Sequence, residues 1–228
     1  MCGRFTLTRS AAEVAAHFEL DAVPAHTPRF NVAPTQLVLA IRAGADGAQR
    51  EAALLSWGLV PSWAQHARDA AKQINARVET LTERPAFREA AEQRRCLVPA
   101  DGFYEWRGGP GAREPFHIAL PQRELFAFAA LWERWQPAGG GVLESVAIVT
   151  TPAAPNIRAL HGRMPIVVDP SGYDAWLSPA ARDVREVLAA LPVSRGTQLV
   201  PRRVSARVND VRNDDARLLE AAEQGALF

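Results

Sequence analysis

The sequence predicts an α+β fold: a single compact, β-rich domain with a largely antiparallel sheet and peripheral helices. Strand-like segments outnumber helix-like ones, and short Gly-rich stretches at residues 107–111 and 138–141 are typical of tight turns between consecutive strands. No internal repeat or low-complexity linker divides the chain. Its 228 residues, of ordinary globular composition, are enough to bury one sizeable core. We therefore expect one domain over residues 1–228.

The first half of the chain begins with a helix and continues mainly with strands. Ser10 and Glu13 have the spacing of a capping box, which predicts a short helix with Val14 and Phe18 on one face. Prolines and polar residues predict an ordered loop over residues 21–35. Apolar, β-branched and aromatic residues predict two strands, and a helical pattern follows them: these elements are expected at residues 36–42, 51–58 and 79–93.

The second half has the pattern of consecutive strands with helices near its end. Both Gly-rich stretches lack the spacing of a phosphate-binding loop and are interpreted as hairpin turns. A polar, mostly helical tail is expected after Asn213. Strands are expected at residues 96–106, 115–120, 125–132, 143–150, 165–168 and 197–201, and helices at 172–177 and 179–190.

The charge balance argues against a polybasic protein. With 26 Lys and Arg against 25 Asp and Glu, the formal net charge is +1, which is not that of a histone-like binder, although a local basic groove is compatible with it. Lys72 is the only lysine, so phosphate contacts should come from arginine. No apolar segment is long enough for a signal sequence or a bilayer span, which predicts a soluble, cytoplasmic protein.

The two cysteines form no disulfide framework and suit a reducing compartment. Cys96 lies in an apolar stretch and is interpreted as an inert core thiol. A zinc site needs about four nitrogen, sulfur or oxygen ligands. No such spacing connects Cys96 with the histidines outside the motifs below, so neither a metal nor another cofactor is expected. These histidines are His17, His26, His66 and His117.

Cys2 is the residue with the clearest chemistry. Its small side chain permits removal of Met1, which leaves an α-amine and a thiol on adjacent carbons. Their reference pKa values, about 7.7–8.0 and about 8.5, make both groups partly nucleophilic near neutral pH. With an aldehyde, this 1,2-aminothiol forms an imine that the thiol closes into a thiazolidine. With an amide or ester, the thiol attacks and the α-amine acts as base. Alternatively, Cys2 has no function and is merely the residue that follows the start codon.

Six ordered motifs give the chain a family resemblance. They are residues 1–5 (MCGRF), 30–34 (FNVAP), 57–63 (WGLVPSW), 74–80 (INARVET), 96–106 (CLVPADGFYEW) and 161–165 (HGRMP), followed by matching residues between 204 and 213. Together they resemble the SOS response-associated peptidase family, whose members shield abasic sites in single-stranded DNA. The resemblance runs from residue 1 to about residue 214 and implies a compact, β-rich α+β fold with its active site around the processed N-terminus.

Four catalytic roles are implied by the resemblance. Cys2 matches the nucleophile that joins the open-chain aldehyde of the abasic sugar, and Asn75 matches the asparagine whose amide hydrogen-bonds the thiazolidine. Glu105 would orient the Cys2 amine and assist proton transfer, and His161 would act as acid–base in opening the sugar ring. From the residues alone, Asn75 also fits a turn or strand end, and Glu105 also fits a salt bridge to an arginine.

The resemblance also predicts the DNA contacts. Arg4, Arg77 and Arg163 stand beside these residues, where guanidinium groups can bind phosphates bidentately. The alternative is that one or two of them pair with internal carboxylates. Pro34 and Trp63 match loop positions used as wedge and stacking surface, although the loop after Trp63 departs from the family pattern. Other tryptophans in strand-like stretches are expected in the core: Trp57, Trp106 and Trp132.

The sequence therefore predicts a monomer that binds single-stranded DNA, or a single-strand/double-strand junction, at an abasic site and forms a thiazolidine through Cys2. It would need no membrane and would be nucleoid-associated when bound to DNA. Self-removal of Met1 and a weak abasic-site lyase activity are further expectations, with Lys72 as the competing Schiff-base amine. Two other classes stay open. One is an amidohydrolase that uses Cys2, against which the absence of glutamine-pocket motifs weighs; the other is a non-catalytic single-strand binder.

Overall fold

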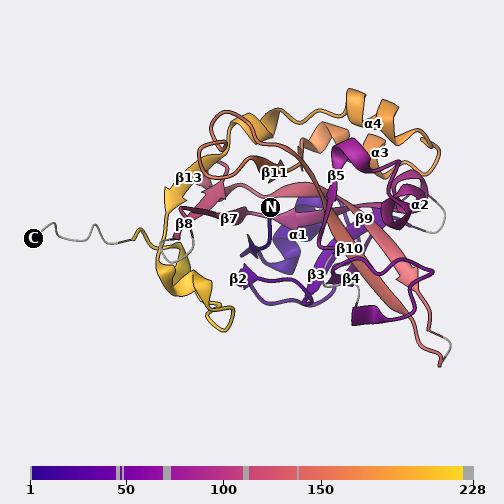
Figure 1. The fold of residues 1–228 in the computed structure, drawn as a ribbon, viewed down its shortest axis with the longest axis horizontal. Coiled ribbons are helices and arrows are strands. Elements are labelled where there is room, and N and C mark those ends of the chain that lie inside the picture. Colours follow the sequence, from indigo (N-terminus) through magenta and orange to yellow (C-terminus); the bar gives the residue numbers. More distant parts are fainter. Residues whose placement is uncertain are drawn as a thin grey trace, which may run out of the picture.

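Two sheets form the framework of the molecule (Figure 1). The computed structural model describes residues 2–44, 47, 49–68, 73–109, 113–137 and 139–222. The smaller sheet has five antiparallel strands in the order β13–β8–β7–β1–β2. Its strands are β1 (Phe5–Leu7), β2 (Arg29–Val32), β7 (Gly102–Arg107), β8 (Glu114–Ala119) and β13 (Val200–Arg203).

The larger sheet closes on itself. Pairing runs from β10 through β4, β3 and β6 to β9, and β9 pairs back to β10, so these strands form a ring. Within the ring only β10 and β4 are parallel, and β5 joins β10 in parallel from outside. A closed ring leaves few open strand edges. Its strands and their extensions are β3 (Leu37–Ala43), β4 (Arg50–Trp57), β5 (Asn75–Arg77), β6 (Arg95–Ala100), β9 (Phe126–Trp135), β10 (Leu143–Pro152), β11 (Arg163–Pro165) and β12 (Val167–Val168).

Aromatic side chains pack the two sheets together. Phe5 of β1 contacts Trp57 of β4 edge-on, with ring centroids 5.2 Å apart, and Phe128 of β9 at 5.9 Å. Phe103 of β7 packs on the same Phe128 at 6.0 Å. All these rings are buried, and each contributes about 1.5–3 kcal/mol of hydrophobic stabilisation. The packing holds β1, and with it the start of the chain, against the ring of strands.

Short helices cover the outside of the sheets, and three of them gather at the right of Figure 1. They are α1 (Ala11–Phe18), α2 (Pro85–Gln93), α3 (Tyr173–Leu177) and α4 (Val184–Ala190). The predicted capping box is present at the start of α1, where Ser10 Oγ accepts from Glu13 N and the Glu13 carboxylate accepts from Ser10 N. Val14 and Phe18 of this helix are fully buried.

Residues 204–219, which we call the closing segment, pack on the outer face of the five-stranded sheet. Tyr104 of β7 forms a second, smaller core with three residues of this segment. The buried Asn31 amide holds the same segment, because its Nδ2 lies 3.3, 3.1 and 2.7 Å from three backbone carbonyl oxygens. The core residues are Val204, Val208 and Leu218, and the carbonyls are those of Val208, Asp210 and Asn213.

The prediction of an α+β fold with a largely antiparallel sheet is confirmed, but one strand was predicted wrongly. Residues 96–106 form two strands, β6 and β7, which belong to different sheets. The chain bends between them at Asp101, whose buried carboxylate accepts hydrogen bonds from Thr6 Oγ1 at 2.5 Å and Thr8 N at 2.7 Å. These long-range bonds from the first strand explain the bend.

Smaller differences concern short elements. The predicted loop at residues 21–35 contains β2, and the helix expected over 79–93 begins only at Pro85, after the 3-10 turn η2 (Val78–Thr80). A proline is favourable in the first turn of a helix, since its missing N–H has no partner there. The expected helical tail contains only the 3-10 turn η7 (Ala216–Leu219) in its described part, and residues 223–228 lie outside the described residues. No helix in the described part of the chain is long and apolar enough to cross a bilayer.

Candidate active site

Cys2 lies fully buried where the chain enters β1. The position follows from the strand pairing, because β1 is held between β2 and β7. Its thiol makes a long contact with the Arg4 carbonyl oxygen, at 3.9 Å from Sγ. Burial raises the pKa of the Cys2 thiol far above its ordinary value, and the negative charge of Glu105 acts in the same direction. Because it is buried in this way, the Cys2 thiol is protonated at neutral pH.

Asn75 reaches Cys2 from the larger sheet. It is the first residue of β5, which pairs in parallel with β10 through Ile148. Its Nδ2 donates a hydrogen bond of 2.7 Å to the backbone carbonyl oxygen of Cys2. Its Oδ1 is buried and accepts no hydrogen bond from the described residues, so an acceptor remains for a further donor. The side chain therefore connects the two sheets at the start of the chain.

Glu105 comes from β7, the strand beside β1. Phe103 and Glu105 alternate with Tyr104 along this strand, so Glu105 faces the same side as the core ring of Phe103. The side chain is buried, and this burial raises the pKa of its carboxyl, while the charge of His161 acts in the opposite direction. A carboxyl whose pKa is raised holds its proton more readily and can act as a general acid.

His161 precedes β11 and is half-buried. Its Nδ1 lies 3.0 Å from the backbone nitrogen of Arg163 and 3.1 Å from the carbonyl oxygen of the same residue. These two contacts fix the orientation of the imidazole, with Nε2 on the opposite side of the ring.

A cavity of about 690 Å³ lies beside the start of the chain. Glu105 and His161 line it, and Gly3 places the start of the chain at its wall. Trp106, Arg113 and Asn209 also line it, although the motifs indicated none of them as functional. Trp106 was predicted in the core but is only half-buried, and its Nε1 donates 2.7 Å to Asn209 Oδ1. Sequence reasoning missed this pair because Asn209 belongs to the closing segment and meets β7 only in the folded chain.

Two of the three predicted phosphate-binding arginines have internal partners. Arg4 donates to Asn31 Oδ1 at 2.7 Å and to the Val208 carbonyl oxygen at 2.9 Å. Arg163 forms a bidentate ion pair with Glu79, at 2.9 Å to each oxygen. Arg163 therefore pairs with an internal carboxylate, which was the alternative to a phosphate contact. Arg77 is exposed, and its side chain donates no hydrogen bond within the described ranges.

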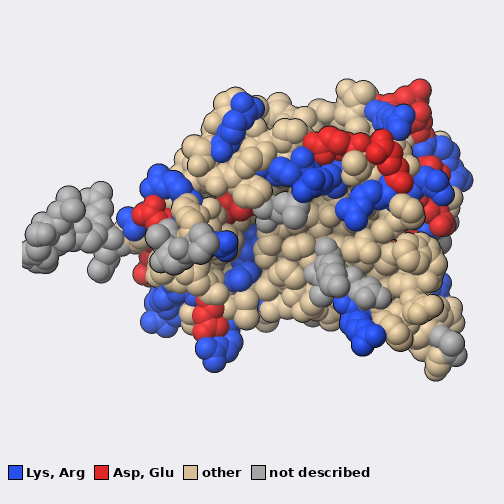
Figure 2. Space-filling view, viewed as in Figure 1, with Lys and Arg blue, Asp and Glu red and all other residues tan. Residues whose placement is uncertain are grey.

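The predicted wedge and stacking residues lie in turns. Trp63 is 65% exposed, which is unusual for a tryptophan. Its loop is attached to the larger sheet by the Trp135 Nε1 hydrogen bond to the Ala64 carbonyl oxygen, 2.6 Å long. Pro34 is half-buried in the turn after β2. Figure 2 shows basic side chains scattered over this face, with acidic ones gathered toward its upper right.

Several predicted features do not enter the site. Trp57 is fully buried as predicted, and Trp132 is half-buried under the Arg42 guanidinium, 4.2 Å from the ring centroid. Cys96 is fully buried as a free thiol. Met1 and Lys72 lie outside the described residues, as do residues 69 and 70 of the loop after Trp63. Among the described residues no group of three or more His, Cys, Asp or Glu side chains is placed to hold a metal ion.

Comparison with known proteins extends over almost the whole chain. A family model described as SOS response associated peptidase (SRAP) matches residues 1–211. The chain is similar to the Bacillus subtilis abasic site processing protein YoqW, with 36% identity over 225 residues that cover 97% of this chain and 100% of YoqW. It is 37% identical to the B. subtilis abasic site processing protein YoaM over 225 residues, or 97% of this chain and 98% of YoaM.

A solved structure of a Bacteroides thetaiotaomicron protein has the same fold. Its TM-score is 0.83 at 23% sequence identity, over 97% of this chain and 100% of that one.

Proposed function

The chain belongs to the SOS response-associated peptidase family, and we propose that it captures abasic sites in single-stranded DNA through a covalent bond to Cys2. Two relatives of nearly equal length carry the name abasic site processing protein. The observation that carries the proposal is the convergence of Asn75, Glu105 and His161, from three separate segments, on the start of the chain.

The proposed reaction needs the α-amine of Cys2. Hydrolysis of the Met1–Cys2 peptide bond consumes one water and releases methionine. The amine then adds to the aldehyde carbon of the opened sugar, and loss of one water gives an imine. Attack by Sγ on the imine carbon, with transfer of the thiol proton to nitrogen, closes the thiazolidine. Protein and DNA thus join with the net loss of one water.

Three side chains would serve these steps. Glu105, whose pKa is raised by burial, is suited to deliver the proton that leaves with the hydroxyl of the carbinolamine. His161, whose Nδ1 is held by the backbone of Arg163, would act through Nε2 as the acid–base group that opens the sugar ring. Asn75 would hold the Cys2 carbonyl and offer its free Oδ1 to the thiazolidine N–H.

The burial of Cys2 has a consequence for the thiol step. A thiol with a raised pKa is a poor nucleophile until its proton is removed. Proton transfer within the site is therefore part of ring closure, and the Glu105 carboxylate, whose negative charge acts on the thiol, would be its base. The amine adds first, because it does not depend on this step.

DNA binding would use the exposed side chains around the site. Arg77 and Trp63 are available to a phosphate and a base without loss of an internal contact. Arg163 would exchange Glu79 for a phosphate, or share it. Stacking of a base on Trp63 would contribute about 1–3 kcal/mol without sequence preference.

The experiment is intact-mass and denaturing-gel analysis after incubation with abasic and intact single-stranded oligonucleotides. Protein without Met1 should give a heat-stable adduct with abasic DNA only, at the summed mass less one water. Cys2→Ala should give none, and the matched variant Cys96→Ala should react like the wild type because Cys96 is a buried thiol outside the site.

Two results would contradict the proposal. One is an adduct that survives Cys2→Ala but is lost in Lys72→Ala after borohydride trapping, which would move the imine to Lys72. The other is the absence of any adduct from correctly processed wild type. Glutamine hydrolysis by that protein would then indicate an amidohydrolase, and fully salt-reversible binding of both oligonucleotides would indicate a non-catalytic binder.

A further inference from the structure

A second cavity lies on the outer face of the five-stranded sheet, away from Cys2. It has a volume of about 760 Å³, within the usual range for small-molecule sites. Its floor includes His117 of β8, which is opposite Tyr104 in the strand register, with ring centroids 5.0 Å apart. This cavity shares no lining residue with the cavity around Glu105 and His161.

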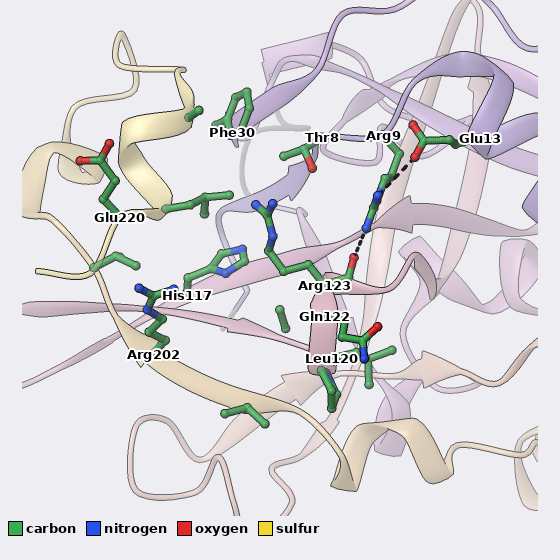
Figure 3. A pocket seen from close by; sticks show the side chains of 16 residues that line it. Thr8, Arg9, Glu13, Phe30, His117, Leu120, Gln122, Arg123, Arg202 and Glu220 are labelled. Atoms are coloured by element: carbon green, nitrogen blue, oxygen red, sulfur yellow. Dashed lines mark hydrogen bonds and ion pairs between the residues drawn. The ribbon is translucent and has the colours of Figure 1, made fainter.

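Two guanidinium groups at this cavity have no protein partner. Figure 3 shows Arg123 extending from its turn toward Thr8 and His117, with Arg202 beside His117. Both are exposed, and neither side chain forms an ion pair or hydrogen bond within the described part of the chain. Arg9, by contrast, pairs with Glu13 at 3.2 Å and donates 2.7 Å to the Arg123 carbonyl oxygen. Of the two carboxylates that also line the cavity, Glu13 pairs with Arg9, and Glu220 forms no ion pair with Arg123 or Arg202.

The turn that carries Arg123 has a strained backbone. Gln122 and Arg123 are consecutive non-glycine residues with φ of 59° and 52°, in the left-handed region that side chains disfavour. Such residues cost about 1–3 kcal/mol each, and they occur preferentially at functional sites. The bond from Arg9 to the Arg123 carbonyl holds this turn in place. The turn carries the chain from β8 of the five-stranded sheet to β9 of the larger sheet.

His117 supplies a buried polar group directed at the same cavity. The side chain is 5% exposed, and its Nε2 lies 3.1 Å from Thr6 Oγ1. The ring fits over Gly102, where a Cβ atom would come within 2.1 Å of Nε2. Burial, together with the charges of Arg123 and Arg202, lowers the pKa of His117 to about 3, so the ring is neutral. Thr6 Oγ1 donates its proton to Asp101, so Nε2 of the neutral ring is the donor to Thr6. Nδ1 makes no hydrogen bond with the described residues and remains as an acceptor for a ligand.

From these observations we propose that the cavity binds a nucleotide, with Arg123 and Arg202 on its phosphate group and His117 Nδ1 accepting a hydrogen bond from a hydroxyl of its sugar. The opposite wall is apolar and includes Phe30 and Leu219, which suits a base. The cavity is far larger than inorganic phosphate alone requires. The nucleotide is either free or the 5′-phosphorylated end of a DNA strand, and both present the same terminal phosphate group.

Isothermal titration calorimetry of the full chain with dAMP tests this proposal. We expect saturable binding, weakened about tenfold or more by Arg123→Gln or by Arg202→Gln, since a hydrogen bond to a charged group is worth about 1.5–3 kcal/mol. Arg203→Gln is the matched control, because Arg203 is the next residue of β13 and pairs with Glu114 at 3.0 Å on the other side of the strand. It should bind dAMP like the wild type.

Three further titrations decide the ligand. 2′-Deoxyadenosine and inorganic phosphate should each bind at least about tenfold more weakly than dAMP, because each lacks half of the contacts. With Cys2→Ala protein, a stronger affinity for a 5′-phosphorylated oligonucleotide than for its unphosphorylated twin, lost in Arg123→Gln, would identify a strand end as the source; binding of dAMP alone would identify a free nucleotide.

The proposal is overturned if dAMP does not saturate the protein, if deoxyadenosine or inorganic phosphate binds as tightly as dAMP, or if both arginine variants bind dAMP like the wild type. None of these outcomes bears on the proposed function, since abasic-site capture is measured separately as the Cys2 adduct and should persist in Arg123→Gln and Arg202→Gln.

Discussion

A single hydrogen bond ties the start of the chain to the larger sheet. Asn75 Nδ2 donates to the Cys2 carbonyl oxygen at 2.7 Å, and the amide is the only side chain of β5 that reaches across in this way among the described residues. The family resemblance indicated Asn75 as functional, yet its partner is a backbone atom that no motif names. The position of Cys2 is therefore controlled by an amide donor.

Asn75→Asp should slow adduct formation about tenfold to a hundredfold. The substitution keeps the shape but puts an acceptor opposite the Cys2 carbonyl oxygen, and an unmade buried hydrogen bond costs about 1–3 kcal/mol. The rate is measured by single-turnover gel assays with abasic single-stranded DNA. Asn156→Asp is the matched control, because Asn156 Nδ2 also donates to backbone carbonyls, those of Thr197 and Leu199. Equal rates for both variants would contradict the role of Asn75.

His117 should make the stability of the protein depend on pH. Its folded pKa is lowered to about 3 from 6.5, so the unfolded chain binds more protons between these values. The stabilisation is complete above pH 6.5 and is lost as the pH falls toward 3, by about 1.4 kcal/mol per pH unit. Urea unfolding at several pH values measures this slope, which should be smaller by about one proton in His117→Gln.

His66→Gln is the control for this slope, since His66 is exposed and its replacement should leave the pH dependence unchanged. Identical slopes for wild type and His117→Gln would mean that the buried imidazole is protonated in the folded protein.

Among the elements, β1 and the bend between β6 and β7 depend on each other. Asp101 is 1% exposed and accepts from Thr6 Oγ1, Thr8 N and Thr8 Oγ1. Through these bonds one carboxylate joins the first strand to the point where the chain leaves the ring of strands for the five-stranded sheet. Glu105 follows four residues later, so the bend also sets the position of this carboxyl.

Asp101→Ala should lower the free energy of unfolding by about 3 kcal/mol or more. Three donors would lose a buried acceptor, at about 1–3 kcal/mol for each one left without a partner. Urea unfolding followed by far-UV circular dichroism measures the change. Asp21→Ala, an exposed aspartate whose side chain makes no hydrogen bond with the described residues, should change stability by less than about 0.5 kcal/mol. A similar effect of both substitutions would show that the bend does not need Asp101.

The elements that sequence reasoning predicted well are those with local signals. The capping box of Ser10 and Glu13 defines the start of α1, and runs of apolar, β-branched and aromatic residues define β3 and β4. The strands β1 and β5 have only three residues each, too short for a periodic pattern, and exist because they pair with distant partners. The break at Asp101 was invisible for the same reason, because its hydrogen-bond partners are 93 and 95 residues away.

Part of the candidate site was also predictable from the sequence. Motif matching led to Asn75, Glu105 and His161, which lie around the start of the chain, and their chemical roles stay predictions. It did not reveal that Arg4 is held by Asn31, nor that Arg163 is held by Glu79, because a side chain's partner depends on tertiary packing. The cavity around His117 was missed entirely, since Arg123 and Arg202 lie outside every motif.

For the molecule as a whole, net charge limits the non-covalent affinity for DNA that the proposed function requires. A net charge of +1 means that only local arginines neutralise phosphates. Each phosphate contact on a single strand contributes about −0.7 to the slope of log K against log salt. With Arg4, Arg77 and Arg163 in contact, intact single-stranded DNA should show a slope of roughly −2.

Fluorescence anisotropy of Cys2→Ala protein measures this slope without covalent capture. Arg77→Gln should reduce its magnitude by about 0.7, whereas Arg88→Gln, an exposed arginine of α2, should leave it unchanged. A slope near zero, or one that Arg77→Gln does not alter, would exclude these arginines as the phosphate contacts.

The pairing of β1 also determines when the surroundings of Cys2 can form during translation. Phe5 pairs with Phe103, and Asn75 with Ile148, so the strands around Cys2 are completed by residues that are synthesised long after it. At about 5–20 residues per second, roughly 8–30 s separate the appearance of Cys2 from that of Arg163. Throughout this interval the strand partners that bury Cys2 are still missing. The proposed capture reaction can therefore begin only once translation is nearly finished.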